Sequence, residues 1–270
     1  MNAPQTRPLA MVTGASSGIG YELAQQFALH GYDLIIAADD AEELAGAADR
    51  LQQVDSAMFM KSVTVDLALP EGVTTLYNTA ATLKRPVDVL AANAGIGVWG
   101  DFARETSLDA ELRLINLNVT SQVHLIKLVV ADMVDRGSGK ILITSSIASL
   151  APGPDYAVYA ASKAFLRSFG QAIRQELEDS GVSVTVLMPG PTDTEFFERA
   201  DMLTSKAAQG PKQDPAEVAA EAFEALENNK DHVVTGAKNK LQATASKLVP
   251  DKVGARMHGS QTKPEPRNPR

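Results

Sequence analysis

Cysteine is absent from this chain of 270 residues, and its four histidines lie far apart. The absence of cysteine excludes disulfides, thiolate nucleophiles and cysteine metal sites, and the isolated histidines lack the spacing of metal ligands. No apolar run approaches the length of about 18 residues that a membrane-spanning helix needs. We therefore expect neither a metal site nor a membrane span.

Positive charge is also in short supply, because 25 Lys and Arg face 33 Asp and Glu, which gives a formal net charge of −8 at pH 7. This balance argues against nucleic acid as the main partner. Residues 1–8 contain no signal-peptide core, which predicts a cytoplasmic protein. Only the region after Gly236 is basic, and we interpret it as a solvated helix and tail rather than a membrane or partner surface.

Apolar runs of strand length alternate with helical segments along the chain. This pattern predicts an α/β fold, with a doubly wound parallel sheet between two layers of helices. We expect a single domain over 1–255, and a disordered tail over 256–270 because this part is rich in proline and charge. The seven expected strands cover 9–13, 33–38, 58–64, 87–91, 140–144, 182–188 and 232–234.

A glycine-rich turn follows the first expected strand, with the sequence Thr13-Gly14-Ala15-Ser16-Ser17-Gly18-Ile19-Gly20, and it opens an amphipathic helix. Glycines let backbone amides approach an anion closely, and the helix N-terminus adds partial positive charge. The turn therefore predicts a cradle for a dinucleotide pyrophosphate. Its letters also fit G-x-S-x-G, the hydrolase nucleophile elbow, but that elbow follows several strands and this turn follows the first.

Three more motifs come later in the chain, namely Asn93-Ala94-Gly95, Tyr159-x-x-x-Lys163 and Pro189-Gly190. With the glycine turn they resemble the short-chain dehydrogenase/reductase family over residues 8–235. The resemblance implies a Rossmann-like sheet of seven strands, the cofactor NAD(P)(H), and hydride transfer between an alcohol and a carbonyl compound. The alternative is a non-catalytic dinucleotide-binding sensor or scaffold with the same fold, which usually carries an incomplete catalytic set.

Tyr159 and Lys163 are four residues apart in an expected helix over 156–178, so they share one face. A tyrosine has a pKa of about 10, and a nearby ammonium group shifts that pKa downward. In the family the tyrosine is the general acid/base, and the lysine also binds the nicotinamide ribose. Tyr156 is a rival, but the residue four positions later is Ala160.

The resemblance adds two catalytic candidates. Ser146, 13 residues before Tyr159, matches the serine that donates to the substrate oxygen, and its neighbour Ser145 should point the other way. Asn118 matches the asparagine that kinks a helix and holds a water near the lysine, with Asn116 as the alternative. The expected catalytic set is thus Asn118, Ser146, Tyr159 and Lys163.

Ligands of such a sheet bind beyond the carboxyl ends of its strands, at the switch point of strand order. By resemblance, Asp66 accepts a hydrogen bond from the adenine amino group, and the residues after Pro189-Gly190 approach the carboxamide or pyrophosphate. The expected cofactor residues are Gly14, Ser16, Ser17, Gly18, Ile19, Gly20, Asp39, Asp66, Leu67, Asn93, Ala94, Gly95, Tyr159, Lys163, Pro189, Gly190, Thr192 and Thr194.

The choice between NAD and NADP depends on Asp39, which lies 19 residues after Gly20. An acid near this spacing bonds the ribose 2′-hydroxyl and repels a 2′-phosphate, so NAD(H) is favoured. No basic residue stands at Ala38, Asp39, Asp40 or Ser17 to neutralise a phosphate. The competing interpretation is that Asp39 or Asp40 only caps the next helix.

Residues 193–213 carry Phe196, Phe197, Met202 and Leu203. In the family this region is a mobile lid over the substrate. Its apolar side chains, without an obvious arginine clamp, predict a lipophilic, uncharged carbonyl or secondary alcohol. The alternative is that these residues only pack the lid.

Family members commonly pair through two long helices, which here span about 107–136 and 156–178. The second helix carries Phe165, Phe169 and Ile173, and the side of this helix that faces the sheet need not bury all three. We therefore expect a homodimer or homotetramer. The alternative is a monomer in which all three residues pack on the sheet and the basic segment 236–252 covers any remaining apolar patch.

Overall fold

Seven parallel strands form one sheet in the computed structural model, which describes residues 7–246, 254 and 259. Their order is β3-β2-β1-β4-β5-β6-β7, which confirms the predicted doubly wound α/β fold. The strands are β1 (Leu9–Thr13), β2 (Asp33–Ala38), β3 (Met60–Thr64), β4 (Val89–Ala92), β5 (Gly139–Thr144), β6 (Val182–Met188) and β7 (His232–Val234).

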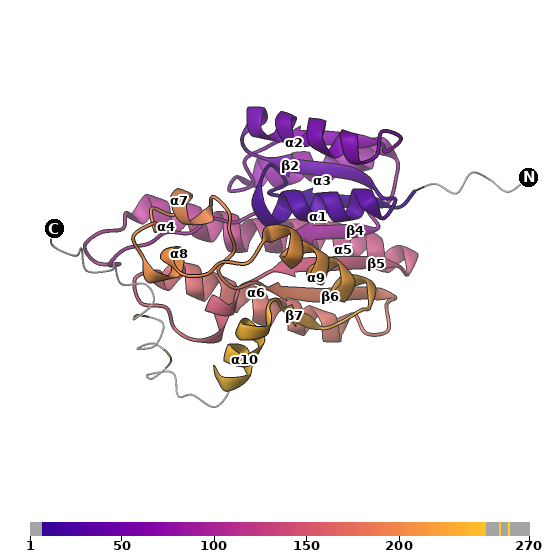
Figure 1. The fold of residues 1–270 in the computed structure, drawn as a ribbon. Coiled ribbons are helices and arrows are strands. Elements are labelled where there is room, and N and C mark those ends of the chain that lie inside the picture. The colour runs from indigo at the N-terminus through magenta and orange to yellow at the C-terminus, as the bar shows by residue number, and fades with distance from the viewer. Residues whose placement is uncertain (1–6, 247–253, 255–258, 260–270) are drawn as a thin grey trace, which may run out of the picture.

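Helices cover both faces of this sheet. They are α1 (Gly18–Leu29), α2 (Ala41–Val54), α3 (Pro70–Leu83), α4 (Leu108–Ile115), α5 (Ser121–Arg136), α6 (Ala157–Glu176), α7 (Phe196–Arg199), α8 (Lys206–Gln209), α9 (Pro215–Glu227) and α10 (Ala237–Ser246). One hydrophobic core joins the sheet to α1, α2 and α9, and a second joins it to α3, α5 and α6 (Figure 1). The sheet is therefore buried between two helical layers.

Burial on both faces explains why the central strands β1 and β4 consist almost entirely of apolar residues. Successive side chains of a strand point to opposite faces. In β1, Leu9 and Met11 belong to the core with α3, α5 and α6, whereas Ala10 and Val12 belong to the core with α1, α2 and α9. Apolar side chains are thus needed at consecutive positions of the central strand.

The third and fourth strands begin two residues later than expected, at Met60 and Val89. A side chain explains the later start of β3. The Phe59 N–H donates to Asp33 Oδ1 at 2.9 Å, so a carboxylate replaces a ladder partner there. Asp33 is buried and also forms an ion pair with Arg85 at 2.7 Å.

The helical stretch expected over 107–136 is continuous but changes its winding. A π-helical turn, Asn116–Thr120, separates α4 from α5. By length and composition Leu108–Arg136 could span a membrane. Leu125 and Val129 are instead buried in the core against the sheet, so we interpret it as a core helix.

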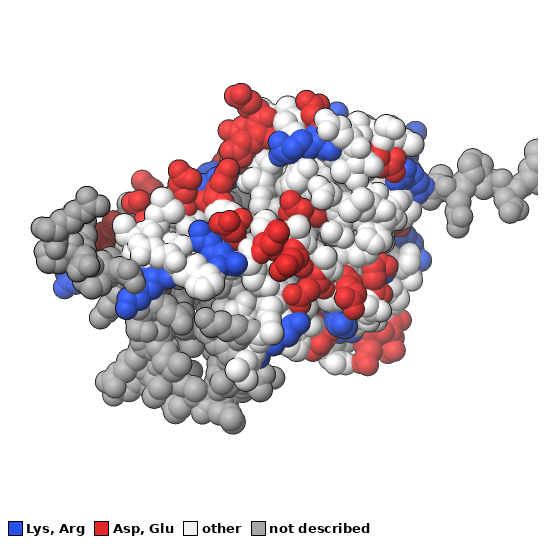
Figure 2. Space-filling view, viewed as in Figure 1, with Lys and Arg blue, Asp and Glu red and all other residues white. Residues whose placement is uncertain are grey.

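Acidic side chains dominate the surface shown in Figure 2, where they gather over α9 and α2 with basic side chains scattered between them. This distribution agrees with the net charge of −8. The last part of the basic segment, 247–252, and nearly all of the expected tail, 256–270, lie outside the described residues. The expected domain limits therefore stay predictions.

We predict that Asp33→Ala lowers the free energy of unfolding by about 3 kcal/mol, because it leaves the Phe59 N–H and the Arg85 guanidinium without their carboxylate and leaves Arg7 with Asp55 alone. Urea denaturation measures this loss. Asp132→Ala is the control, since Asp132 accepts an exposed hydrogen bond from Tyr77 and its loss should cost less than about 1 kcal/mol. Equal losses in the two variants would contradict the role of Asp33.

Candidate active site

A cleft of about 440 Å³ opens beyond the carboxyl ends of β1 to β6. Each residue that the sequence predicts for cofactor binding lines it, as do three of the four predicted catalytic residues. The fourth, Asn118, does not line the cleft and is buried behind Ile96, to which it is hydrogen-bonded. Residues from eight widely separated motifs and loops are thus brought to one place by the ends of parallel strands.

Side-chain hydrogen bonds connect the carboxyl ends of β1 and β4, the neighbouring strands at which the strand order reverses. The Thr13 hydroxyl oxygen accepts from the N–H groups of Asn93 and Ala94 at 2.9 and 3.0 Å. The Asn93 amide donates to the Thr13 carbonyl at 3.2 Å, and its oxygen accepts from the Thr144 hydroxyl at 3.1 Å. Asn93 therefore ties the ends of β1, β4 and β5 together beside the cleft.

The glycine turn forms a tight cradle at the end of β1. Gly14 and Gly18 have φ of +65° and +54°, a conformation that side chains disfavour. A Cβ at Gly20 would lie 1.9 Å from the Gly14 carbonyl oxygen, and one at Gly18 would lie 2.9 Å from Thr194. Ser17 makes no side-chain cap bond to α1, so the first amides of this helix suit an anion in the cleft. These features fit a dinucleotide pyrophosphate.

Tyr159, Ser146 and Lys163 meet in the opposite half of the cleft. Tyr159 and Ser146 both line the cleft, and the Ser146 side chain acts on the Tyr159 hydroxyl as a hydrogen-bonding neighbour that lowers its pKa. The Lys163 ammonium lies 5.7 Å from the centre of the tyrosine ring. Lys163 is buried and donates to the Thr144 carbonyl at 3.0 Å. A hydroxyl pair and a buried ammonium therefore face one opening.

Burial controls the protonation of both groups. It raises the pKa of the Tyr159 hydroxyl to about 12, although the hydrogen bond with Ser146 acts in the opposite direction. Burial also lowers the pKa of Lys163 to about 8. The sequence-based expectation that Lys163 lowers the pKa of Tyr159 is not met in the protein alone, because desolvation is the larger effect.

The geometry separates the rival residues that the sequence left open. The Ser145 hydroxyl donates to the Lys163 carbonyl at 2.7 Å, so it is engaged with the backbone of α6. The ring of Tyr156 lies 6.1 Å from that of Tyr159, and burial raises the pKa of Tyr156 strongly. Asn116 is exposed on the far side of the π-helical turn. These positions favour Ser146, Tyr159 and Asn118.

Asn118 is buried and supports the loop after β4. Its side chain accepts from the Ile96 N–H and donates to the Ile96 carbonyl, both at 2.9 Å, and it also donates to the Ser162 hydroxyl at 3.2 Å. A Cβ on Gly95 would lie 3.0 Å from Asn118 Oδ1 and 3.3 Å from Lys163 Nζ. The asparagine and the lysine thus flank the same glycine.

The adenosine end of the expected site carries a charge that sequence reasoning missed. Arg113 of α4 lies 2.8 Å from Asp66 and 3.6 Å from Asp39. The turns after β1 and β2, where the sequence pattern places the selectivity for a 2′-phosphate, contain no basic residue at Ser17, Ala38, Asp39 or Asp40. Arg113 is remote in sequence, but the switch point brings α4 beside these turns. Its place five residues before Asn118 does not predict these contacts, so no local sequence signal points to it.

The segment 193–213 folds back over the cleft. The Asp193 N–H donates to the Gln213 carbonyl at 2.8 Å, which joins the two ends of the segment. The Phe196 ring lies 5.2 Å from that of Tyr159. Phe197 and Met202 also line the cleft, whereas Leu203 is exposed. Its movement as a lid stays a prediction.

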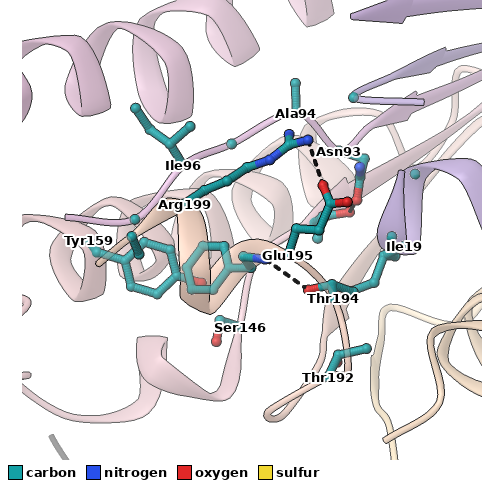
Figure 3. Close-up of a pocket in the computed structure, with 18 of the residues that line it drawn as sticks. Ile19, Asn93, Ala94, Ile96, Ser146, Tyr159, Thr192, Thr194, Glu195 and Arg199 are labelled. Atoms are coloured by element: carbon teal, nitrogen blue, oxygen red, sulfur yellow. Dashed lines mark hydrogen bonds and ion pairs between the residues drawn. The ribbon is translucent and has the colours of Figure 1, made fainter. Parts of the chain in front are cut away.

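Ion pairs tie this segment to the glycine turn. Arg199 lies 2.7 Å from Glu43 of α2 and 2.6 Å from Glu195, a contact that is dashed in Figure 3. The Ser16 hydroxyl donates to Glu43 at 3.2 Å. Ser16, the residue at the centre of the G-x-S-x-G pattern, is thus paired with a carboxylate. Among the described residues no cluster of His, Asp and Glu could hold a metal ion.

Residues 8–204 match the family model described as short chain dehydrogenase. The chain belongs to this family. It is 32% identical over 219 residues to an uncharacterized oxidoreductase of Staphylococcus saprophyticus, an alignment that covers 81% of this chain and 91% of the relative. The enzyme is therefore an NAD(P)-dependent oxidoreductase.

Two solved structures show the same architecture. A short-chain dehydrogenase from Sphingobium yanoikuyae in complex with NADPH has a TM-score of 0.79 and 28% identity, and the match covers 89% of this chain and 94% of that one. The bulky-bulky ketone specific alcohol dehydrogenase from Comamonas testosteroni has a TM-score of 0.74 and 27% identity, with 89% and 93% covered. The predicted family and cofactor class are thus confirmed.

The lowered pKa of Lys163 predicts a rise of stability with pH. The unfolded lysine keeps its proton up to about pH 10.5, whereas the folded one releases it near pH 8, so the unfolded state binds more protons between these values. Between about pH 7.5 and about pH 9.5, the free energy of unfolding of the wild type should rise by about 2 kcal/mol more than that of Lys163→Met.

Urea denaturation at both pH values measures this difference. Lys61→Met, which removes an exposed lysine of β3, is the control and should keep the wild-type pH dependence. Parallel profiles for wild type and Lys163→Met would show that Lys163 has no lowered pKa.

Proposed function

We propose that this dehydrogenase interconverts a secondary alcohol and a carbonyl compound, with Tyr159 as the general acid/base. The observation that carries the proposal is the position of Tyr159, which lines the cleft beside Ser146 and has the Lys163 ammonium 5.7 Å from the centre of its ring. A hydroxyl pair of this kind can bind one substrate oxygen. Tyr159 can then exchange a proton with that oxygen.

Each group has a separate task in the reduction direction. Ser146 donates a hydrogen bond to the substrate oxygen and stabilises the negative charge that develops there. Tyr159 gives its proton to that oxygen. The dinucleotide supplies the hydride, or takes it up in the reverse direction, and its oxidised ring adds positive charge. Lys163 binds the ribose hydroxyls and stabilises the tyrosinate that remains.

Asn118 acts as a positioning residue in this proposal. Its two hydrogen bonds to Ile96 fix the backbone beside Gly95, and Gly95 separates it from Lys163. The site therefore keeps the lysine at the correct distance from the cleft. The water that the family resemblance implies between Asn118 and Lys163 stays a prediction.

The cofactor is proposed to bind across the whole cleft. The turn from Gly14 to Gly20 holds the pyrophosphate, and the segment from Asn93 to Gly95 lines the adenosine ribose. Asp66 meets the adenine, Leu67 lies next to it, and the turn from Pro189 to Thr194 faces the carboxamide. We propose a preference for NAD(H), because Asp39 is exposed at this end and favours a free ribose hydroxyl.

The substrate is proposed to be lipophilic and uncharged. Phe196, Phe197 and Met202 line the cleft near Tyr159 together with Ile147. The cations of the cleft wall are engaged elsewhere, since Arg199 pairs with Glu43 and Glu195. The similar enzyme from Comamonas testosteroni, a bulky-bulky ketone specific alcohol dehydrogenase, supports the same substrate class.

A purified-protein assay tests the substrate class. NADH and NADPH oxidation is followed with bulky aryl and alicyclic ketones, steroid ketones, sugars and keto acids of similar size. We expect turnover with the uncharged apolar ketones and little with keto acids. Dinucleotide binding without turnover on any carbonyl or alcohol would instead support the sensor or scaffold interpretation.

Tyr159→Phe is predicted to lower kcat by about 10³-fold while the dinucleotide affinity stays within a few-fold, because the hydroxyl supplies a proton rather than binding energy. Lys163→Ala should lose both activity and affinity. Steady-state rates and dinucleotide titration measure the two quantities. Tyr156→Phe is the matched control and should keep most of the activity; if it is the inactive variant instead, Tyr156 is the acid.

We also propose a cytoplasmic homodimer or homotetramer. Apolar side chains remain exposed on α4 and α6, two helices that pack against each other. Leu108, Leu112 and Ile115 of α4 and Phe165 of α6 are 72%, 48%, 38% and 42% exposed. Phe169 and Ile173 pack partly against the core, so only Phe165 of the three expected residues is left for an interface.

We predict that the double variant Leu112→Glu/Phe165→Glu is a folded monomer, because charges on both helices oppose burial of this surface. Sedimentation equilibrium at micromolar concentration gives the mass, and circular dichroism checks the fold. Leu29→Glu, a change of an equally exposed leucine on α1, should leave the assembly intact. A single species near 28.6 kDa, the mass of one chain, for the wild-type protein would contradict the proposed assembly.

A further inference from the structure

A guanidinium group lies at the adenosine end of the cleft between two carboxylates. Arg113 Nη1 is 2.8 Å from Asp66 Oδ2, and Arg113 Nη2 is 3.6 Å from Asp39 Oδ2. All three residues line the cleft, and they come from α4 and from the ends of β3 and β2. The charge that faces the adenosine ribose therefore depends on a pair of residues, not on Asp39 alone.

Asp39 has no structural task in its own turn. Asp40 is the N-cap of α2, since its carboxylate accepts from the Glu43 N–H at 2.8 Å. The side chain of Asp39 is 61% exposed and forms an ion pair with Arg113, and its charge also helps to raise the pKa of Arg199. The helix-cap interpretation thus applies to Asp40, and the Asp39 carboxylate is available to act on a ligand.

The contact between Arg113 and Asp39 is weak enough to be exchanged. Both side chains are well exposed, and an exposed ion pair contributes less than about 1 kcal/mol. A phosphate group, by contrast, accepts two parallel hydrogen bonds from a guanidinium and carries more charge than a carboxylate. Arg113 can therefore exchange Asp39 for a phosphate while it keeps Asp66.

We propose that Asp39 and Arg113 form one selectivity pair, in which Arg113 is the cation that binds a ribose 2′-phosphate and Asp39 prevents this in the wild-type enzyme. Asp39 does so by holding Arg113 and by repelling the phosphate. The inference deepens the proposed function and rests on it, since it concerns the dinucleotide site. It follows that loss of the Asp39 charge is sufficient to admit NADP(H), without a new arginine.

Calorimetric titration with two nucleotides tests the pair without catalysis. AMP and adenosine 2′,5′-bisphosphate differ only in the 2′-phosphate, so the ratio of their dissociation constants isolates that group. We expect Asp39→Asn to shift this ratio toward the bisphosphate by about tenfold. Glu42→Gln removes a charge from the exposed first turn of α2 and is the control, with a shift below about threefold.

The double variant Asp39→Asn/Arg113→Met decides the role of the arginine. The tenfold gain should disappear in it, although Met keeps much of the apolar stem of Arg113. Asp39→Asn/Arg199→Met should retain the gain, because Arg199 is held by Glu43 and Glu195. NAD⁺ and NADP⁺, titrated in the same way, should repeat the pattern, and circular dichroism confirms that each variant is folded.

Three results would overturn the proposal. The ratio could stay unchanged in Asp39→Asn, the gain could survive in Asp39→Asn/Arg113→Met, or it could disappear in Asp39→Asn/Arg199→Met, which would assign the phosphate to Arg199. Failure of wild type to bind AMP, NAD⁺ and NADP⁺ at all would be a different result. It would reject the dinucleotide site, and with it the proposed function.

Discussion

The reversal of strand order at β1 and β4 is the constraint on which the rest of the structure depends. These two strands are neighbours in the sheet, and the chain leaves them toward opposite edges, so the turns that follow them leave a gap at their carboxyl ends. Thr13 and Asn93 satisfy the backbone groups that the gap frees, and Thr144 extends the network to β5. The cradle, the catalytic hydroxyls and the adenosine end all lie along this opening, so one topological feature positions them together.

Burial gives this site its chemical character. It favours the neutral forms of both Tyr159 and Lys163, with pKa values of about 12 and about 8. The protein alone therefore keeps the tyrosine protonated, which suits a proton donor in carbonyl reduction. In the proposed reaction, positive charge from a bound oxidised dinucleotide would lower the pKa of the tyrosine, as the alcohol-oxidising direction requires. The cofactor and Tyr159 would thus be coupled through electrostatics.

Much of this arrangement could be predicted from the sequence, because it depends on local patterns. Apolar runs give the seven strands, and Tyr159 and Lys163 share a face through helical spacing. Arg113 could not be found in this way, since its contacts with Asp39 and Asp66 join segments that only the folded sheet brings together. The direction in which the pKa of Tyr159 shifts could not be predicted from the sequence either, because desolvation depends on the full surroundings of a side chain.

Isotope transfer tests the central claim, hydride transfer to a carbonyl carbon at the Tyr159 site, most directly. The enzyme would reduce a bulky ketone with a dinucleotide deuterated at the transferable position, and separately with an unlabelled dinucleotide in D₂O, with mass spectrometry of the product. The account predicts one deuterium on the carbinol carbon in the first reaction and none on that carbon in the second. Deuterium that enters the carbinol carbon from solvent, or no transfer of label from the dinucleotide, would contradict it.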